Sequence, residues 1–198
     1  MLVLVFALAT AAGAPSYVLD PQRSSVTIHV GKAGLFKGAG HEHAVAAGTF
    51  RGSVVADEVD LSRSSVEAVW QSAGLKVTGD GEPAKDVPEV QAVMVGPRVL
   101  DAARYPEIVF RSRAVEGKRV SPGVYELKVT GEFTLHGVSR TMVLPLRVEL
   151  VGDLLTATGR ATLEQTAFGI KPVTAAGGMV KVKDALEIEY RLVGRRSP

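Results

Sequence analysis

The sequence contains no cysteine among its 198 residues. Without cysteine the chain can form no disulfide, offers no thiolate nucleophile and supplies no cysteine ligand to zinc. A chain of this length can bury a core large enough to fold without such cross-links, and its length favours one domain. We therefore expect a single domain that is held together by packing and hydrogen bonding.

The chain also lacks a surplus of charge of either sign. It has 23 basic and 21 acidic residues, which give a formal net charge of +2. The basic residues are scattered, and no run of them is longer than Arg195-Arg196. Proteins that bind nucleic acid usually gather lysine and arginine in a stripe or patch. Nucleic acid is therefore excluded as an expected partner.

Long hydrophobic runs are scarce, and the one at the N-terminus is too short to cross a bilayer. Residues 1–14, MLVLVFALATAAGA, have the length of the apolar region of a secretory signal peptide, whereas a spanning helix needs about 20 apolar residues. Ala12-Gly13-Ala14 has the form of a cleavage site, Ala9-Thr10-Ala11 is an alternative one, and no lysine or arginine precedes Leu2. A buried first strand is the other interpretation. We expect residues 1–14 to be a signal peptide, residues 15–198 to form the domain, and the protein to be periplasmic or secreted.

Alternation of apolar and polar residues is what the sequence has in abundance. Tyr125, Leu127 and Val129, for example, are separated by charged residues. This period of two is typical of strands with one dry and one wet face, and the segments lack the three- and four-residue apolar spacing of an amphipathic helix. We predict strands at residues 24–31, 43–56, 64–74, 106–116, 123–135, 140–151, 154–164 and 183–194, with a further short strand near 17–20.

Two segments depart from this alternation. The spacing in residues 82–106 predicts a short helix at 86–95 that stops at Gly96-Pro97, and residues 168–178 are predicted to be a shorter helical or irregular segment. The short, turn-rich connections elsewhere indicate antiparallel neighbours. About eight such strands would leave exposed edges in an open sheet, so we expect an all-β barrel or sandwich. An eight-stranded barrel has room for side chains or one slender ligand.

Four segments of the chain resemble the YceI family in order and spacing. They are YVLDPQRSSVTIHV at 17–30, VLDAARYPEIVFRS at 99–112, VTGEFTLHGVSRTMVLPLRVE at 129–149 and TATGRATLEQTAFGI at 156–170. The resemblance covers nearly all of the chain after Tyr17. It implies an antiparallel eight-stranded lipocalin-like β-barrel with one or two short helices, exported to the periplasm or secreted. It further implies that an isoprenoid lipid or quinone binds along the barrel axis, and that there is no agreed catalytic activity.

Two segments differ from the usual pattern of that family. GDGEPAKDVPEVQAVM, at residues 79–94, stands where an arginine-containing segment usually follows the third strand, so no ligand contact is carried over there. GHEH, at residues 40–43, resembles a branch of the family that carries Gly-His-x-His.

We predict that inward-facing side chains line a ligand-binding interior. The candidates are Ile28, Val30, Phe36, Trp70, Phe110, Leu127, Phe133, Leu144, Leu146, Phe168 and Ile188. A filled core is the alternative for each of them. Small residues on the same faces would leave room, or would merely permit curvature: Ala44, Ala46, Gly48, Ala68, Gly131, Ala157, Gly159 and Ala161.

His41 and His43 project from the same face if the segment is a strand, because side chains repeat every second residue. We predict that both lie at the barrel opening and hydrogen-bond the polar head group of an apolar lipid. No other cofactor is expected. The expected partners are this lipid, a membrane in transient contact and, for the chain itself, a second copy in a homodimer.

The alternative function is a metal-binding protein, with or without hydrolytic activity. His41 and His43 could share one zinc ion if another histidine or a carboxylate supplied a third ligand. His136 lies close to Ser139 in sequence, as a base must lie close to a nucleophile in space. Gly-x-Ser-x-Gly, Gly-x-Gly-x-x-Gly and Walker patterns are absent from the sequence, so we predict no enzymatic activity and assign no catalytic or metal-binding residue.

Overall fold

The computed structural model describes residues 14–33, 43–80, 83–175 and 180–198. Its strands are β1 (Ser16–Leu19), β2 (Ser25–Ala33), β3 (His43–Ala47), β4 (Phe50–Val55), β5 (Ser65–Gln71), β6 (Leu75–Val77), β7 (Glu107–Ser121), β8 (Val124–Leu135), β9 (Val138–Val151), β10 (Leu154–Glu164), β11 (Thr174–Ala175) and β12 (Val180–Arg196). The helical elements are α1 (Val87–Val95) and the 3₁₀ turns η1 (Leu61–Arg63), η2 (Ser72–Gly74) and η3 (Gln165–Phe168). The predicted signal peptide lies outside the described residues except for Ala14.

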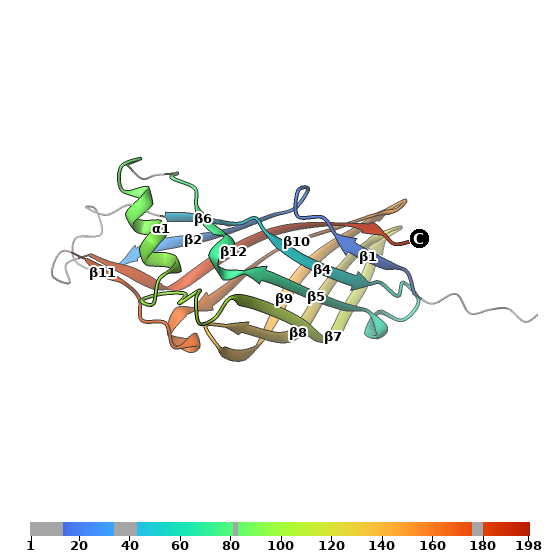
Figure 1. The fold of residues 1–198 in the computed structure, drawn as a ribbon. Coiled ribbons are helices and arrows are strands. Elements are labelled where there is room, and N and C mark those ends of the chain that lie inside the picture. The colour runs from blue at the N-terminus through green and yellow to red at the C-terminus, as the bar shows by residue number, and fades with distance from the viewer. Residues whose placement is uncertain (1–13, 34–42, 81–82, 176–179) are drawn as a thin grey trace, which may run out of the picture.

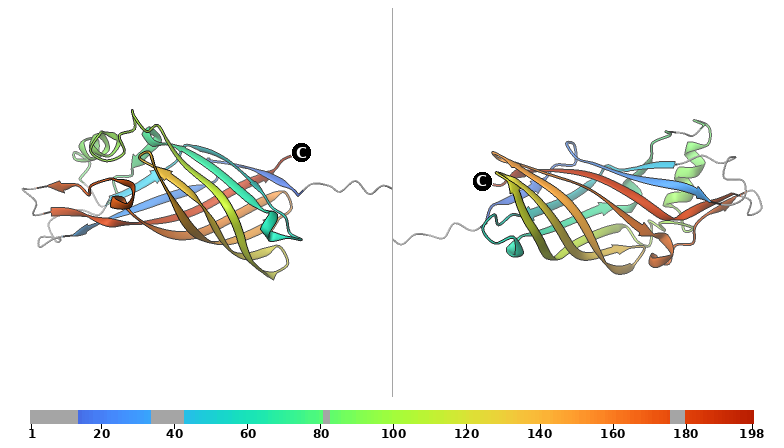
Figure 2. Two further views of the ribbon diagram at one scale, coloured as in Figure 1. Left: turned by 90° about the horizontal axis from the view of Figure 1, so that it is seen from below. Right: turned by 180° about the vertical axis from the view of Figure 1, so that it is seen from behind.

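Eight strands close into an antiparallel barrel, which confirms the predicted fold. The ring runs through β1, β4, β5, β7, β8, β9, β10 and β12, and β12 pairs back with β1. In Figures 1 and 2 the strands wind obliquely around one long axis. This closure gives each of the eight strands two neighbours and leaves no free edge in the ring.

The ring is extended by shorter strands at the end of the barrel where α1 lies (Figure 1). There β12 pairs with β2, β2 with β3, and β3 with β6. The prediction of an unbroken strand at 43–56 is therefore wrong, because Gly48 and Thr49 separate β3 from β4. The strand predicted at 64–74 ends at Gln71, where η2 begins, and β6 was not predicted. A closed barrel curves more tightly than a long straight strand, and glycines mark such bends.

Two segments were predicted to depart from strand structure, one as a helix and one as a helical or irregular segment. The helix expected at 86–95 is α1, with Pro88 in its first turn, where a missing N–H breaks no intrahelical bond. Residues 169–173 are irregular, as one of the two possibilities for 168–178 predicted, and β11 follows them. The helical turn η3 lies just before this segment and is capped by Gly169, whose φ is +74°.

A single glutamine fastens α1 to the free edge of β6. The Gln91 Oε1 accepts a hydrogen bond from the Val77 N–H at 2.9 Å, and the Gln91 Nε2 donates to the Leu75 carbonyl at 2.9 Å. The side-chain amide thus replaces the peptide group of a neighbouring strand and satisfies a donor and an acceptor that would otherwise be left at the edge. The helix is held across this end of the barrel as a result.

The alternation in the sequence reappears as alternating burial in β8. Tyr125 and Val129 are each 2 % exposed, whereas Glu126 and Lys128 are exposed to solvent. The apolar faces of the strands therefore point inward and the charged faces outward.

Candidate functional site

An apolar cavity of about 580 Å³ occupies the barrel. Every strand of the closed ring contributes side chains to its wall, and α1 contributes Val90 and Met94 at one end. Leu61 of η1 lies at the other end. This volume falls within the range of about 300–1,000 Å³ that is typical of small-molecule sites.

Small inward alanines leave room for the cavity, whereas two glycines make room for aromatic rings. Ala68, Ala157 and Ala161 line the cavity. At Gly131 and Gly159, by contrast, an added Cβ would lie within 3 Å of the rings of Phe110 and Tyr190, respectively. The two glycines therefore leave room for these aromatic rings beside the backbone.

Ten of the thirteen residues predicted to contact a ligand line the cavity, which makes them available for that role. They are Ile28, Val30, His43, Trp70, Phe110, Leu127, Phe133, Leu144, Leu146 and Ile188. Phe36 and His41 lie outside the described residues. Contact with a ligand remains a prediction for all of them.

Phe168 is the exception, and its predicted place in the cavity wall needs correction. It is 2 % exposed and packs edge-to-face against Phe133, with ring centroids 5.7 Å apart. It does not line the cavity, because η3 begins where the alternation of β10 ends. Phe168 therefore supports the wall from behind.

Charged residues of the cavity wall were not among those predicted from the sequence. Lys32, Arg98 and Lys181 line the end near α1, and Asp57 and Glu58 line the end near η1. Lys32 continues the alternation of inward residues along β2, so its place in the cavity wall could have been predicted from the sequence. The other four lie in loops or at an irregular strand end, where periodicity gives no signal.

The loop between β4 and η1 closes one end of the barrel and is tightly hydrogen-bonded. The Asp57 carboxylate accepts hydrogen bonds from the backbone N–H groups of Asp60 and Val59 at 2.9 and 3.0 Å, and the bond from Asp60 is the largest cause that lowers its pKa. The Tyr125 hydroxyl donates to the Glu58 carboxylate at 2.5 Å. Burial, assisted by that hydrogen bond, raises the pKa of Tyr125. The loop is thus held together by its own backbone and joined to the barrel wall through Tyr125.

His136 has a structural role in the turn between β8 and β9. Its Nδ1 lies 3.3 Å from the Phe168 carbonyl oxygen, and its ring packs against Tyr105 with centroids 4.6 Å apart. The Ser139 hydroxyl is hydrogen-bonded to Thr134 at 2.7 Å. Within the described residues no hydrogen bond joins His136 to Ser139, so this pair gives no support to nucleophilic catalysis.

The geometry of a metal site cannot be built from the residues that the structure describes. Among them, no group of three or more histidine, aspartate or glutamate side chains could hold a metal ion. His43 lines the cavity, and His41 lies outside the described residues. His29 faces outward, 4.0 Å from the Glu189 carboxylate.

Across the same described segments, no helix is long and apolar enough to cross a membrane.

The barrel and its interior define a class of protein: a closed, lipocalin-like antiparallel barrel around an apolar cavity. Residues 17–194 match the family described as the YceI-like domain, and the chain belongs to that family.

Comparisons with individual proteins agree with this assignment. UPF0312 protein VPA0850 of Vibrio parahaemolyticus is 29% identical over 156 residues, which cover 76% of this chain and 71% of that protein. BcnA of Burkholderia cenocepacia has a similar structure, with a TM-score of 0.68, 21% identity, and 88% and 98% of the two chains covered. The YceI protein of Campylobacter jejuni has a TM-score of 0.59 at 12% identity, covering 78% of this chain and 85% of that one. The structural likeness shows the fold, and the family indicates a small binding protein rather than an enzyme.

Proposed function

We propose that this protein binds an isoprenoid-type lipid, either a polyprenyl lipid or a quinone, inside its barrel. The apolar cavity along the barrel is the observation that carries this proposal. Each methylene group that leaves water for such a cavity contributes about 0.8 kcal/mol. A long unbranched or prenyl tail can therefore bind with few polar contacts.

The protein would act as a carrier or sequestering protein outside the cytoplasm. This part of the proposal rests on the signal-peptide pattern of residues 1–14 and on the family of the chain. Transient contact with a membrane would load and unload the lipid. His43 lies opposite Val30 on paired strands and lines the cavity near the end of the barrel where α1 lies, so that its imidazole could hydrogen-bond a head group.

Native mass spectrometry of the purified protein tests the proposal. We expect a non-covalent adduct with the mass of one lipid, which organic extraction should remove and which should carry prenyl units when fragmented. Protein that retains no lipid and takes up none after incubation with a polyprenol or a quinone would refute lipid binding. A bound metal ion in place of lipid would favour the alternative function.

A further inference from the structure

Gln165 is a polar side chain buried in the wall of an otherwise apolar cavity. It is 5 % exposed and lines the cavity. Apart from tyrosines, Ser72 is the other buried polar residue within the described segments, and its hydroxyl is already bonded to the Tyr105 carbonyl. Ligand pockets carry few polar groups, and those few decide the orientation and chemistry of the ligand. The hydrogen bonds of Gln165 therefore indicate what the cavity can recognise.

The protein uses only half of the Gln165 carboxamide. Its Nε2 donates to the Lys183 carbonyl oxygen at 2.8 Å. A carbonyl oxygen can only accept, so this bond fixes which end of the amide is the oxygen. No residue that the structure describes donates a hydrogen bond to the Gln165 Oε1. A buried acceptor without a donor costs free energy, which a donor on a ligand would recover.

The turn that carries Gln165 is held firmly against β12. The Asp184 carboxylate accepts hydrogen bonds from the Thr166 hydroxyl at 2.5 Å and the Thr166 N–H at 2.9 Å, and these bonds lower the pKa of Asp184. Asp184 lies where the pairing of β12 with β2 shifts register, between Val182 and Leu186. Such irregularities redirect side chains beside binding sites. The carboxamide is thus positioned before a ligand binds, which reduces the entropy lost on binding.

Gln165 lies at the same end of the cavity as His43. Leu186 of β12 pairs with Val30 on one side and with Leu163 on the other. Val30 in turn pairs with His43. One row of the sheet therefore runs from His43 to Leu163, and Gln165 follows two residues later. A head group at this end would have both Gln165 and His43 in the wall around it.

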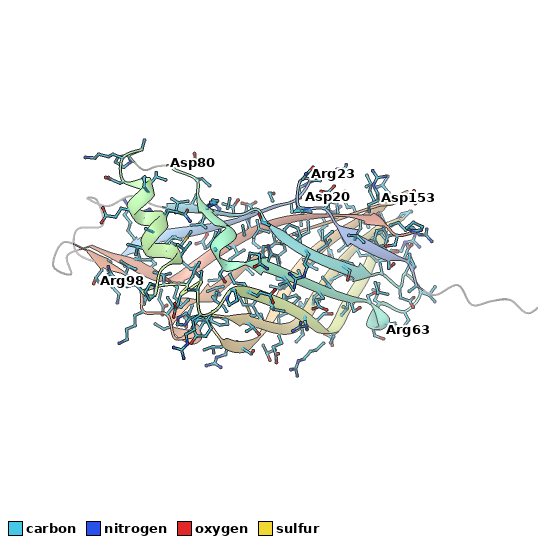
Figure 3. All side chains as sticks on the ribbon, in the orientation of Figure 1. Asp20, Arg23, Arg63, Asp80, Arg98 and Asp153 are labelled. Atoms are coloured by element: carbon cyan, nitrogen blue, oxygen red, sulfur yellow. The ribbon has the colours of Figure 1, made fainter. Side chains whose placement is uncertain are left out.

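The charged residues at this end differ from Gln165, because they face solvent. Three that line the cavity are exposed: Glu89, Arg98 and Lys181. Figure 3 shows Arg98 at the end of the molecule where α1 lies. Water competes with a ligand for such groups and weakens their contribution. Gln165, by contrast, offers its acceptor from a buried position.

We propose that Gln165 selects a ligand whose head carries a hydroxyl group. The hydroxyl donates its proton to the Gln165 Oε1, whereas the carbonyl oxygen of a quinone can only accept and has no proton to offer. The site therefore favours a prenyl alcohol, or the reduced quinol form of a quinone, over the oxidised quinone. This inference rests on the proposed lipid binding and adds the chemical class of the head group.

Two ligands with the same tail test the hydroxyl: geranylgeraniol and its methyl ether, which keeps the oxygen but has no proton to donate. Each is titrated into the purified full chain, after removal of bound lipid, in competition with the fluorescent probe N-phenyl-1-naphthylamine. The readout is the ratio of the two dissociation constants in the wild type and in Gln165→Met, because a ratio cancels any effect of the substitution on the empty protein. One neutral hydrogen bond corresponds to about fivefold in affinity, so we expect Gln165→Met to shift the ratio about fivefold in favour of the ether.

Gln91→Met is the matched control. It also removes a carboxamide that donates to a backbone carbonyl, that of Leu75, but Gln91 does not line the cavity. It should leave the ratio unchanged. A ratio that Gln165→Met does not alter, or that Gln91→Met alters equally, would overturn the role of Gln165. Failure of both ligands to bind the wild type would instead overturn lipid binding itself.

A second measurement does not depend on the folding of a variant. In the wild type, the carbon NMR resonance of the Gln165 side-chain carbonyl should shift more with geranylgeraniol than with the ether. Shifts of the same size with both ligands would contradict the hydrogen bond.

The same titrations with a short-tailed menaquinol and its menaquinone, carried out without oxygen, distinguish the two sources of the hydroxyl. Preference for the quinol that Gln165→Met reduces would support a quinol as ligand. A quinol-to-quinone ratio that the variant leaves unchanged would overturn the quinol and leave the alcohol.

Discussion

Tyr190 closes a gap that Pro145 leaves in the barrel wall. Backbone pairing between β9 and β10 ends at Arg147 and Thr158. Pro145 has no N–H to continue it, and its carbonyl oxygen accepts a hydrogen bond from the Tyr190 hydroxyl at 2.9 Å instead. Gly159 gives the ring room to reach across, and burial raises the pKa of Tyr190 to about 12. One side chain thus links three strands beside the cavity.

Tyr190→Phe should lower the free energy of unfolding by about 1–2 kcal/mol at neutral pH, because the Pro145 carbonyl loses its donor. The difference from the wild type should shrink above pH 10. The pKa of Tyr190 is about 12 in the folded protein and near 10 when unfolded, so the contribution is complete below pH 10 and is lost as the pH rises toward 12.

Urea unfolding of both proteins at about pH 8 and about pH 11 measures this difference. Tyr17 and Tyr125 also have raised pKa values, but they are present in both proteins and cancel. The same difference at both pH values would show that Tyr190 does not titrate with folding.

At the scale of elements, the turn from β8 to β9 is built around Tyr105. His136 and Gly137 both have positive φ angles, +52° and +73°. The Tyr105 ring packs against the imidazole and lies so close to Gly137 that an added Cβ would overlap it. The Tyr-Pro and Leu-His-Gly segments of the family resemblance therefore meet in one packed corner, where their role is structural.

Gly137→Ala should lower the free energy of unfolding by about 2–4 kcal/mol, because it combines a strained backbone with a steric overlap. Gly152→Ala is the matched control in the turn between β9 and β10: its φ is +56°, but nothing lies within 4 Å of the added Cβ. The control should cost about 1–2 kcal/mol from backbone strain alone. Equal losses in chemical denaturation would show that contact with Tyr105 adds nothing.

The fastening of α1 to β6 can be tested separately. Gln91→Ala should speed hydrogen exchange at the Val77 amide by about tenfold, since that N–H loses its acceptor. Glu89→Ala removes an exposed side chain from the same helix and should leave the exchange rate unchanged. Protection of Val77 that is unaltered by Gln91→Ala would mean that the helix is held by apolar packing alone.

At the scale of the whole molecule, the sequence predicts the features that depend on local periodicity, which are the strands and the residues that face inward. The alternation places Ile28, Val30 and Leu127 on the inward faces. It left a barrel and a sandwich open, and the closed eight-stranded barrel was predicted from the family resemblance. The breaks at Gly48 and η2 could not be predicted, because they depend on the curvature of the closed ring. The charges at the two ends escape it because Arg98 and Glu58 reach the cavity from loops, whose positions only the tertiary structure sets.

The size of the cavity also belongs to this scale, since it depends on how side chains pack across the barrel. Trp70 is the single tryptophan of the chain and lines the cavity, so its fluorescence reports on the interior. Ala161 lines the same cavity, whereas Ala114 is exposed on β7. Ala161→Phe adds side-chain volume inside the barrel, and Ala114→Phe adds the same side-chain volume outside it.

Titration of the lipid-free protein with geranylgeraniol, followed by Trp70 fluorescence, tests most directly whether lipid fills the barrel. We predict a saturable change at one lipid per protein, which Ala161→Phe should abolish and Ala114→Phe should preserve. Emission that stays constant at saturating lipid, or undiminished binding by Ala161→Phe, would contradict binding inside the barrel.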